Sequence, residues 1–405
     1  MIKLTGIEVI GLKYINGQEV LPEDLLKEIR KYAEGVYVYI PKSDWKKNKW
    51  GEKTNYHREM ELRNRHIYDK YLEGVEIAAI SECYHLSANS VRRIILSQKR
   101  KMEPVIIMMK ELIKEWNLEG EPVQIYHSAW NINNTYVLKE YDDPNALQRN
   151  LMMMRTLYEA GIPVPKIIQL PDQQDYLERN NKLYVLTAKL KGRNIVKLQE
   201  CDSRWFFEFG ILLAKLHIAF QECEKKISFW NNSMLEEMNG WVNRDLHKFN
   251  PDYLKQDDIK ASIDELAQIY DELPKQLIHR DVHLGNFLFD NGVFSGYIDF
   301  DLSQRNIRIF DLCYFLLGIL LEEDNNRVEK QKWYEIIRQV IGGYDSIAAL
   351  STLEKKAVTC VMKNIEILFT AYFLGIGDEK LAKDSADIYT FVKLNEEKIQ
   401  KAVLV

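Results

Sequence analysis

Apolar residues recur at helical spacing through the first quarter of the chain. Residues 22–33 predict a helix whose inner face carries Leu25, Leu26, Ile29 and Tyr32. Gly35 stands where such a helix ends, and the run Val36–Ile40 predicts a strand. Residues 59–72 predict a charged amphipathic helix, and residues 75–84 a short one. This order predicts a small, mainly helical module.

A third helix of this module is predicted to begin after Ser87, which is a favourable N-cap residue. In the preceding short helix we expect three residues to face inward: Ile77, Ala78 and Ile80. In the third helix Val91, Ile94 and Ile95 share the inner face. Its outer face is polar and basic: Asn89, Ser90, Arg92, Arg93, Gln98 and Lys99. A short helix, a tight turn and a helix with such a face form the helix-turn-helix pattern, whose second helix enters the DNA major groove.

The pattern changes after about residue 102, and a hairpin is predicted in the second half of the chain. Residues 276–278, 287–290 and 293–301 predict three short strands. Asn291-Gly292 separates the last two, and this dipeptide favours a two-residue turn because both of its residues adopt positive φ. Pairing Asp290 with Val293 would place Asn286 opposite Tyr297 and diagonal to Asp299.

Three polar residues near this hairpin suit phosphoryl transfer. Such a reaction needs a carboxylate that orients the attacking hydroxyl group, and oxygen ligands for a metal ion. Asp281, on the loop that enters the hairpin, can supply the first. Asn286 and Asp299 can supply the second.

A second segment repeats the Asp-to-Asn spacing without the same surroundings. Asp245 and Asn250 are five residues apart, as Asp281 and Asn286 are. No apolar strand precedes Asp245, Asn243 stands where His279 does, and no Asn-Gly hairpin follows. We therefore interpret this copy as a helix surface or a loop.

Composition and charge narrow the classes of function. The chain has 405 residues, 46% hydrophobic and 28% charged, which is typical of a soluble globular protein with more than one domain. Its net charge of −5 provides no general attraction for nucleic acid or membrane, but residues 92–101 hold five basic residues and no acidic one. The five cysteines show no metal-ligand spacing and favour a reducing cytoplasm. No signal peptide or membrane span is predicted, since the longest apolar run, near residues 313–321, is short.

The hairpin segment, residues 277–301, resembles the motif of aminoglycoside phosphotransferases, choline kinases and homoserine-kinase-like enzymes. Further similar segments occur in the family's order: residues 135–139, 151–165, 184–192, 209–217 and 311–312. The resemblance implies an α+β, protein-kinase-like fold of two lobes. It implies a small lobe over residues 103–190, a large lobe over residues 191–405, and the use of Mg²⁺ with ATP or GTP.

The same resemblance implies roles for single residues. Asp281 would be the catalytic base or hydroxyl-orienting group, and Asn286 and Asp299 would bind Mg²⁺. Lys139 would contact the α- and β-phosphates of the nucleotide. Two residues would support the catalytic loop: His279, and Asp311 as a helix N-cap. The acceptor would be a hydroxyl group of a small molecule.

Several positions depart from the family pattern. No glycine-rich loop precedes Lys139, and Arg280 stands where glycine is more typical. Asn150 falls where the family has the glutamate that pairs with the lysine, and neither Glu140 nor Glu159 has the spacing to replace it. Two interpretations of Asp301 stay open, a contact to a second metal ion and a solvated strand end. The departures leave an alternative function open: a transcription regulator whose kinase-like domain senses a nucleotide or small ligand with little or no turnover.

The front module, residues 1–102, resembles the DNA-binding part of Mor-type transcription activators. Residues 67–74 and 77–95 carry this resemblance. It implies DNA binding, a homodimer, and four candidate DNA contacts: Asn89, Ser90, Arg92 and Arg93. A small helical adaptor or dimerisation module with a solvated charged face is the alternative.

Overall fold

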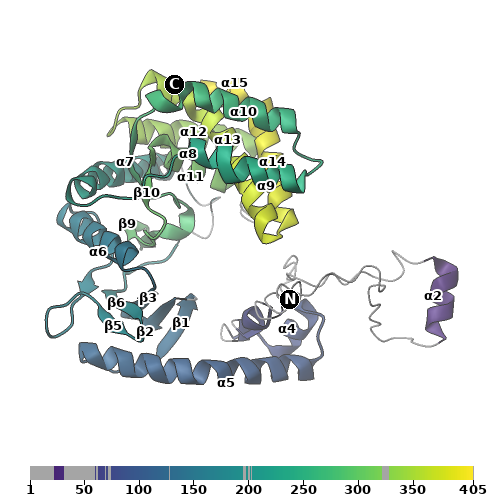
Figure 1. Cartoon of the computed structure of the whole chain (residues 1–405), viewed down its shortest axis with the longest axis vertical. Helices are drawn as coiled ribbons and strands as arrows, with labels where there is room; N and C mark the ends of the chain where they lie inside the picture. The colour runs from purple at the N-terminus through teal and green to yellow at the C-terminus, as the bar shows by residue number, and fades with distance from the viewer. Residues whose placement is uncertain are drawn as a thin grey trace. The chain divides into compact units, whose positions relative to one another are not determined.

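The computed structural model describes residues 22–31, 60, 63–68, 70–71, 74–126, 128–194, 198, 201, 203–321 and 328–404. The chain forms two compact units, Met1–Leu112 and Ile113–Val405 (Figure 1). Each is described by itself below.

The described residues of the first unit lie mainly in helices. The unit contains α2 (Glu23–Arg30), α4 (Ile77–Cys83) and α5 (Ala88–Ile113). The backbone N–H of Ser90 donates a hydrogen bond to Ser87 Oγ at 3.1 Å, which confirms Ser87 as the cap of α5. One buried cluster joins α4 and α5 to the helical residues 63–68: Ile67, Tyr68, Ile80, Tyr84, Val91, Ile95 and Met102. The predicted strand Val36–Ile40 lies outside the described residues.

The buried face of α5 differs from the predicted one. Gln98, expected on the polar face, is buried because it continues the stripe of Val91 and Ile95 at helical spacing. Ala78, expected inside, is exposed because α4 turns Ile80 inward. The predicted boundary at residue 102 also falls inside α5, which continues beyond Pro104 to Ile113.

An antiparallel sheet opens the second unit. Its path is β1 (Pro122–Tyr126), β2 (Ala129–Ile132), β3 (Tyr136–Tyr141), β6 (Lys182–Ala188) and β4 (Ile167–Ile168), and β5 (Leu177–Arg179) also pairs with β6. Helix α6 (Pro144–Glu159) begins at Asp143, whose side chain accepts from the N–H of Asn145 at 2.9 Å. Its apolar face packs on β6 through a cluster of Leu147, Leu151, Met154, Leu183 and Val185.

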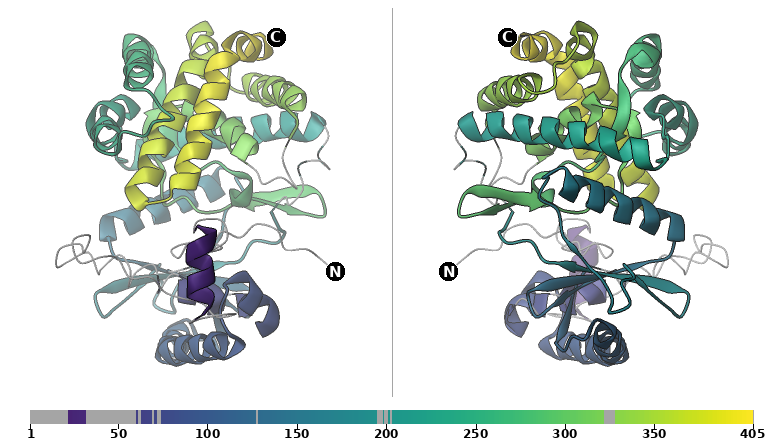
Figure 2. Two further views of the ribbon diagram at one scale, coloured as in Figure 1. Left: turned by 90° about the vertical axis from the view of Figure 1, so that its right-hand side faces the viewer. Right: turned by 90° about the vertical axis from the view of Figure 1, so that its left-hand side faces the viewer.

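The rest of this unit is mainly helical. The helices are α7 (Ser203–Lys226), α8 (Met234–Glu237), α9 (Asn243–Phe249), α10 (Gln256–Ile269), α11 (Ile309–Leu321), α12 (Lys330–Asp345), α13 (Thr352–Ile376), α14 (Glu379–Leu394) and α15 (Glu396–Val403). Strands β1 to β6 and these helices gather at opposite ends of the unit, with α6 between them (Figures 1 and 2). This arrangement is the two-lobe plan expected from the sequence.

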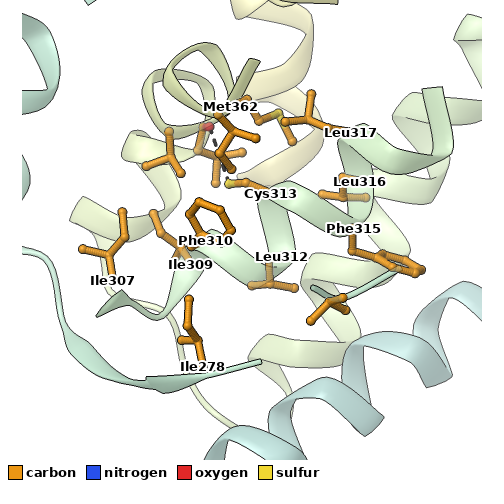
Figure 3. Close-up of a cluster of buried hydrophobic side chains, with 14 of the residues drawn as sticks. Ile278, Ile307, Ile309, Phe310, Leu312, Cys313, Phe315, Leu316, Leu317 and Met362 are labelled. Carbon is orange, nitrogen blue, oxygen red and sulfur yellow. Dashed lines mark hydrogen bonds between the residues drawn. The ribbon is translucent and has the colours of Figure 1, made fainter. Parts of the chain in front are cut away.

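The large lobe is held by a single apolar core. Figure 3 shows the part of it around α11, where Phe310, Leu312 and Leu316 are fully or almost fully buried. The Cys313 thiol donates to the carbonyl of Val358 on α13 at 3.7 Å. Among the described residues, α13 is long and apolar enough to cross a membrane, but most of it is buried in this core.

Two short ladders sit between the sheet of the small lobe and the helices. β7 (Lys275–Ile278) pairs with β10 (Gln304–Ile307), and β8 (Phe287–Asp290) pairs with β9 (Val293–Tyr297). The loop from β7 to β8 and the loop from β9 to β10 therefore leave the same region of the fold. They carry the polar residues that the sequence singled out.

Candidate active site

The predicted hairpin forms, with one irregularity. Asn291 and Gly292 adopt φ of 52° and 80°, as the two-residue turn requires, and Asp290 pairs with Val293. A bulge shifts the register beyond this point, so Phe287, not Asn286, lies opposite Tyr297. The third predicted strand also ends at Tyr297 rather than continuing to residue 301.

The bulge still leaves Asn286 beside the chain that leads to Asp299. The backbone N–H of Ile298 donates to the Asn286 carbonyl at 3.1 Å. Asp299 follows directly and adopts φ of 63°, a conformation that is uncommon outside glycine. The hairpin thus brings the two predicted metal ligands to one end of the ladder, as expected, through a different register.

Asp281 is held by three neighbours. The Tyr314 hydroxyl donates to Asp281 Oδ1 at 3.0 Å, and Asn286 Nδ2 donates to Asp281 Oδ2 at 3.1 Å. His283 Nε2 lies 3.4 Å from the same Oδ2. The carboxylate is thereby fixed at the end of the loop while about a quarter of its side chain surface stays accessible, at 23%.

These contacts keep the Asp281 carboxylate ionised. Burial alone raises its pKa, but the hydrogen bonds and positive charge of His283, with the hydrogen bond from Tyr314, outweigh burial and leave the pKa below its ordinary 3.8. An ionised carboxylate can accept a hydrogen bond from an incoming hydroxyl group and orient it.

The Asn286 and Asp299 side chains suit a magnesium ion. Because Asn286 Nδ2 is directed at Asp281, the amide oxygen is the atom left for a cation. Carboxylate and amide oxygens are the ligands Mg²⁺ prefers, and in kinases it takes only one or two protein ligands beside phosphate and water. Among the described residues no group of three or more His, Cys, Asp and Glu could hold a metal ion.

Lys139 meets this site from strand β3. Its Nζ lies 3.2 Å from Asp299 Oδ1 and forms a shorter ion pair with Asp301 Oδ2. Burial lowers the pKa of Lys139, but Tyr141 and the two carboxylates outweigh it and raise the pKa above its ordinary value. Lys139 therefore stays charged.

Asp301 is exposed, with 39% of its side-chain surface accessible, as a solvated strand end would be, and its contact to a second metal ion stays a prediction. It follows the end of β9, and its carboxylate contacts Lys139, Asn150 and the Tyr141 hydroxyl. Asn150 Nδ2 donates to Asp301 Oδ1 at 2.7 Å, although the two residues are far apart in the sequence.

Asp311 supports the catalytic loop, but not as the predicted N-cap. Helix α11 begins at Ile309, so Asp311 lies in the first turn. Its fully buried carboxylate accepts from the backbone N–H groups of His279 at 2.7 Å and Arg280 at 2.9 Å. The carboxylate thus fixes the two residues before Asp281.

The ring of His279 braces the other side of this loop. It is buried and its Nε2 lies 3.3 Å from the carbonyl of Ile298, next to Asp299. Burial, the largest influence, lowers the pKa of His279 and favours the neutral ring. A neutral ring can donate this hydrogen bond, and it adds no charge near the Asp281 and Asp299 carboxylates.

Arg280 explains why glycine is typical at its position. It adopts φ of 71°, which costs a residue with a side chain about 1–2 kcal/mol. The guanidinium group pairs with Glu237 at 2.8 Å and lies 4.2 Å from the centre of the Phe310 ring. These contacts offset the strain and hold the loop against α8 and α11.

Sequence reasoning missed three supporting residues. His283 could have been noted two positions after Asp281, and Tyr314 one turn after Asp311 on an apolar helix. His217 Nε2 lies 3.0 Å from Asp311 Oδ2, and its Nδ1 lies 2.9 Å from the Tyr344 hydroxyl. No local signal connects His217, on α7, with the loop.

The predicted DNA-contacting residues lie at the start of α5 in the first unit. Asn89, Arg92 and Arg93 are exposed, and Ser90 is half-buried. Arg92 Nη1 donates to Asn89 Oδ1 at 3.1 Å, so these two side chains organise each other.

Comparison with known proteins identifies a family and several relatives of this chain by sequence. The model of the "Phosphotransferase enzyme family" matches residues 123–350, more than half of the chain. The homoserine kinase of Neisseria meningitidis serogroup B is 26% identical over 260 residues, covering 61% of this chain and 78% of that enzyme. The uncharacterized protein YraL of Bacillus subtilis is 33% identical over 87 residues, covering 22% of this chain and 100% of YraL.

Solved structures share the fold at low sequence identity. The amicoumacin kinase hAmiN, in complex with AMP-PNP, Ca²⁺ and Ami, has a TM-score of 0.55 and 15% identity, covering 73% of this chain and 92% of the kinase. Spectinomycin phosphotransferase, in complex with ADP and spectinomycin, has a TM-score of 0.51 and 14% identity, covering 73% of this chain and 98% of the enzyme. With the family match over residues 123–350, the chain belongs to the phosphotransferase enzyme family.

Proposed function

We propose that this protein transfers the γ-phosphoryl group of ATP or GTP to a hydroxyl group of a small molecule. In this proposal Asp281 orients the hydroxyl group, Asn286 and Asp299 hold Mg²⁺, and Lys139 binds the nucleotide phosphates. The bound Mg²⁺ would offset the charge of the transferred group. The protein's own residues position the reactants, since this reaction needs little covalent chemistry from the enzyme.

One observation carries the proposal: the ionised Asp281 is held by Asn286, the residue proposed to hold the metal ion. The amide of Asn286 donates to Asp281 at 3.1 Å and presents its oxygen on the other side. In this proposal one side chain would position both the hydroxyl-orienting group and the metal ion. The acceptor class follows from the relatives, since homoserine and spectinomycin, named for two of them, both carry hydroxyl groups.

The test is an acceptor screen with ATP and GTP in the presence of Mg²⁺. Homoserine, choline and a panel of aminoglycosides would be incubated with the full chain, and phosphorylated products would be detected by mass spectrometry. We expect wild-type protein to phosphorylate at least one acceptor, and Asp281→Asn to lose nearly all of this activity. Equal, near-zero turnover in both proteins would instead favour the sensor function, in which the site binds a ligand without chemistry.

We also propose that the first unit binds DNA through the start of α5. The support is the arrangement of α4, a tight turn and the Ser87-capped α5, with Arg92 and Arg93 exposed. Residues 92–101 hold five basic residues and no acidic one, enough to neutralise several phosphates.

A gel-shift titration at low and raised salt tests DNA binding. We expect binding at low salt that weakens steeply as salt rises, and a weaker interaction for the double variant Arg92→Ala/Arg93→Ala. Failure to bind random-sequence DNA even at low salt would leave the helical adaptor as the better description. Gel filtration of the same samples would test the expected homodimer.

A further inference from the structure

The Lys139 side chain lacks the carboxylate that the family normally provides from the neighbouring helix. That position is Asn150, on α6, and its side chain is buried. An amide carries no charge, so it cannot form an ion pair with the lysine. Glu140, next to Lys139 in β3, pairs with Lys182 at 3.0 Å instead.

A different carboxylate contacts Lys139 in this chain. Asp301 comes from the loop after β9 and pairs through Oδ2 with Lys139 Nζ. Its other oxygen, Oδ1, accepts from Asn150 Nδ2 at 2.7 Å and from the Tyr141 hydroxyl at 3.4 Å. Both oxygens are thus used, one for the lysine and one for the residue that replaces the glutamate.

We infer that Asp301 is the positioning residue for Lys139 and that Asn150 holds Asp301 in place. The inference rests on the proposed binding of nucleotide phosphates by Lys139. The residue types at positions 150 and 301 are compatible. A glutamate at position 150 would place a second negative charge beside Asp301, whereas the Asn150 amide N–H stabilises the Asp301 carboxylate. In this chain the helix carries the amide and the loop after β9 carries the carboxylate.

The proposed metal site gives this second carboxylate a role. Lys139 contacts both Asp299, at 3.2 Å, and Asp301. A magnesium ion on Asp299 would compete with the lysine for that carboxylate, since both are cations. Asp301 is then the partner that remains with Lys139 while the metal ion and the nucleotide are bound.

Three variants of the full chain test the inference. Asp301→Asn removes the charge with little change in shape. Asn150→Glu/Asp301→Asn returns the carboxylate to the helix and puts an amide on the loop. Glu140→Gln is the matched control, because it removes a carboxylate next to Lys139 that serves another lysine.

Two readouts separate positioning from a merely structural role. Equilibrium nucleotide binding, measured by calorimetry, should weaken on the order of tenfold in Asp301→Asn, the loss expected for a hydrogen-bonded charge. KM for the nucleotide should rise by a larger factor than kcat falls. The double variant should bind nucleotide more tightly than Asp301→Asn, and Glu140→Gln should match the wild type. Thermal unfolding of each variant shows whether it is folded.

Other results would overturn the inference in distinguishable ways. Unchanged nucleotide affinity and KM in a folded Asp301→Asn would remove Asp301 from nucleotide binding and leave the proposed function standing. A double variant no better than Asp301→Asn would exclude the exchange between Asn150 and Asp301. No nucleotide binding by the wild-type chain would overturn the proposed function and this role together.

Discussion

Two segments of the large lobe have the same Asp-to-Asn spacing and different structures. Asp281 precedes a short turn and strand β8, and its carboxylate contacts Tyr314 and Asn286. Asp245 lies in helix α9, where its carboxylate contacts the adjacent, exposed Arg244 at 2.9 Å. The prediction that the second segment is a helix surface or loop is confirmed.

The two asparagines differ in the same way. Asn250 follows the last residue of α9 and adopts the left-handed conformation, with φ of 42°. Asparagine is common at this position because it tolerates that backbone conformation. Asn286 is buried and its side chain contacts Asp281. Spacing alone therefore selects neither a function nor a secondary structure, and the elements that follow each segment decide both.

Replacing each of the two aspartates should give the largest difference in activity between the two segments. Asp281→Asn removes the charge that orients the acceptor hydroxyl group, and we expect kcat to fall by roughly 10²–10⁴-fold. Asp245→Asn should stay within about twofold of wild type, since its partner is a solvent-exposed arginine. Steady-state rates with an acceptor found in the screen would measure this. Similar losses in both variants would contradict the assignment.

Replacing each of the two asparagines should affect a different property: the Mg²⁺ dependence for Asn286 and the stability for Asn250. Asn286→Ala removes an oxygen ligand, so the Mg²⁺ concentration for half-maximal rate should rise by about 10–100-fold. Asn250→Ala should leave the Mg²⁺ dependence unchanged but reduce the free energy of unfolding by about 1 kcal/mol, because alanine tolerates positive φ poorly. Magnesium titrations and urea unfolding measure the two effects. A shifted Mg²⁺ dependence in Asn250→Ala would undo the comparison.

The catalytic loop should also depend on a carboxylate that the Asp245 segment lacks. Asp311 accepts from two backbone N–H groups, so Asp311→Asn would turn an amide donor toward at least one of them. We expect a loss of about 2–3 kcal/mol in the free energy of unfolding, as for a buried hydrogen-bonded charge. Urea unfolding would measure it, with Asp245→Asn as control. A loss no larger than in that control would show that the loop does not rely on Asp311.

The sequence predicted the parts of the site that depend on local signals. Asn291-Gly292 predicted the hairpin, and the apolar run at residues 276–278 predicted β7. The bulge in β9 was missed, because residues 293–297 alternate too weakly to reveal an extra residue. The predicted nine-residue strand therefore ends early.

Contacts between distant elements could not be predicted in the same way. Tyr314 reaches Asp281 from α11, and Asn150 reaches Asp301 from α6. These pairs depend on how α6 and α11 pack, which a single sequence does not encode in any local pattern. The missing glutamate at position 150 was therefore recognised, but its replacement was not.

A buried acid on α13, Glu366, has no charged partner among the residues that the structure describes. Glu366 is 1% exposed, and burial raises its pKa to about 8, above the ordinary 4.5. Asp281, by contrast, has its pKa lowered by donors. The two acids should therefore respond to pH in opposite directions.

The sign of the pH effect follows from the proton on Glu366. Between pH 4.5 and 8 the folded protein keeps this proton while the unfolded chain loses it, so stability falls as pH rises across this range. Glu366→Gln removes this dependence and should stabilise the protein by roughly 3–4 kcal/mol more at pH 8 than at pH 5. Urea unfolding at both pH values would measure it, with the exposed Glu397→Gln on α15 as the matched control. If the Glu366→Gln difference from wild type is the same at pH 5 and pH 8, then Glu366 is ionised in the folded protein, and a polar partner rather than a bound proton must compensate its burial.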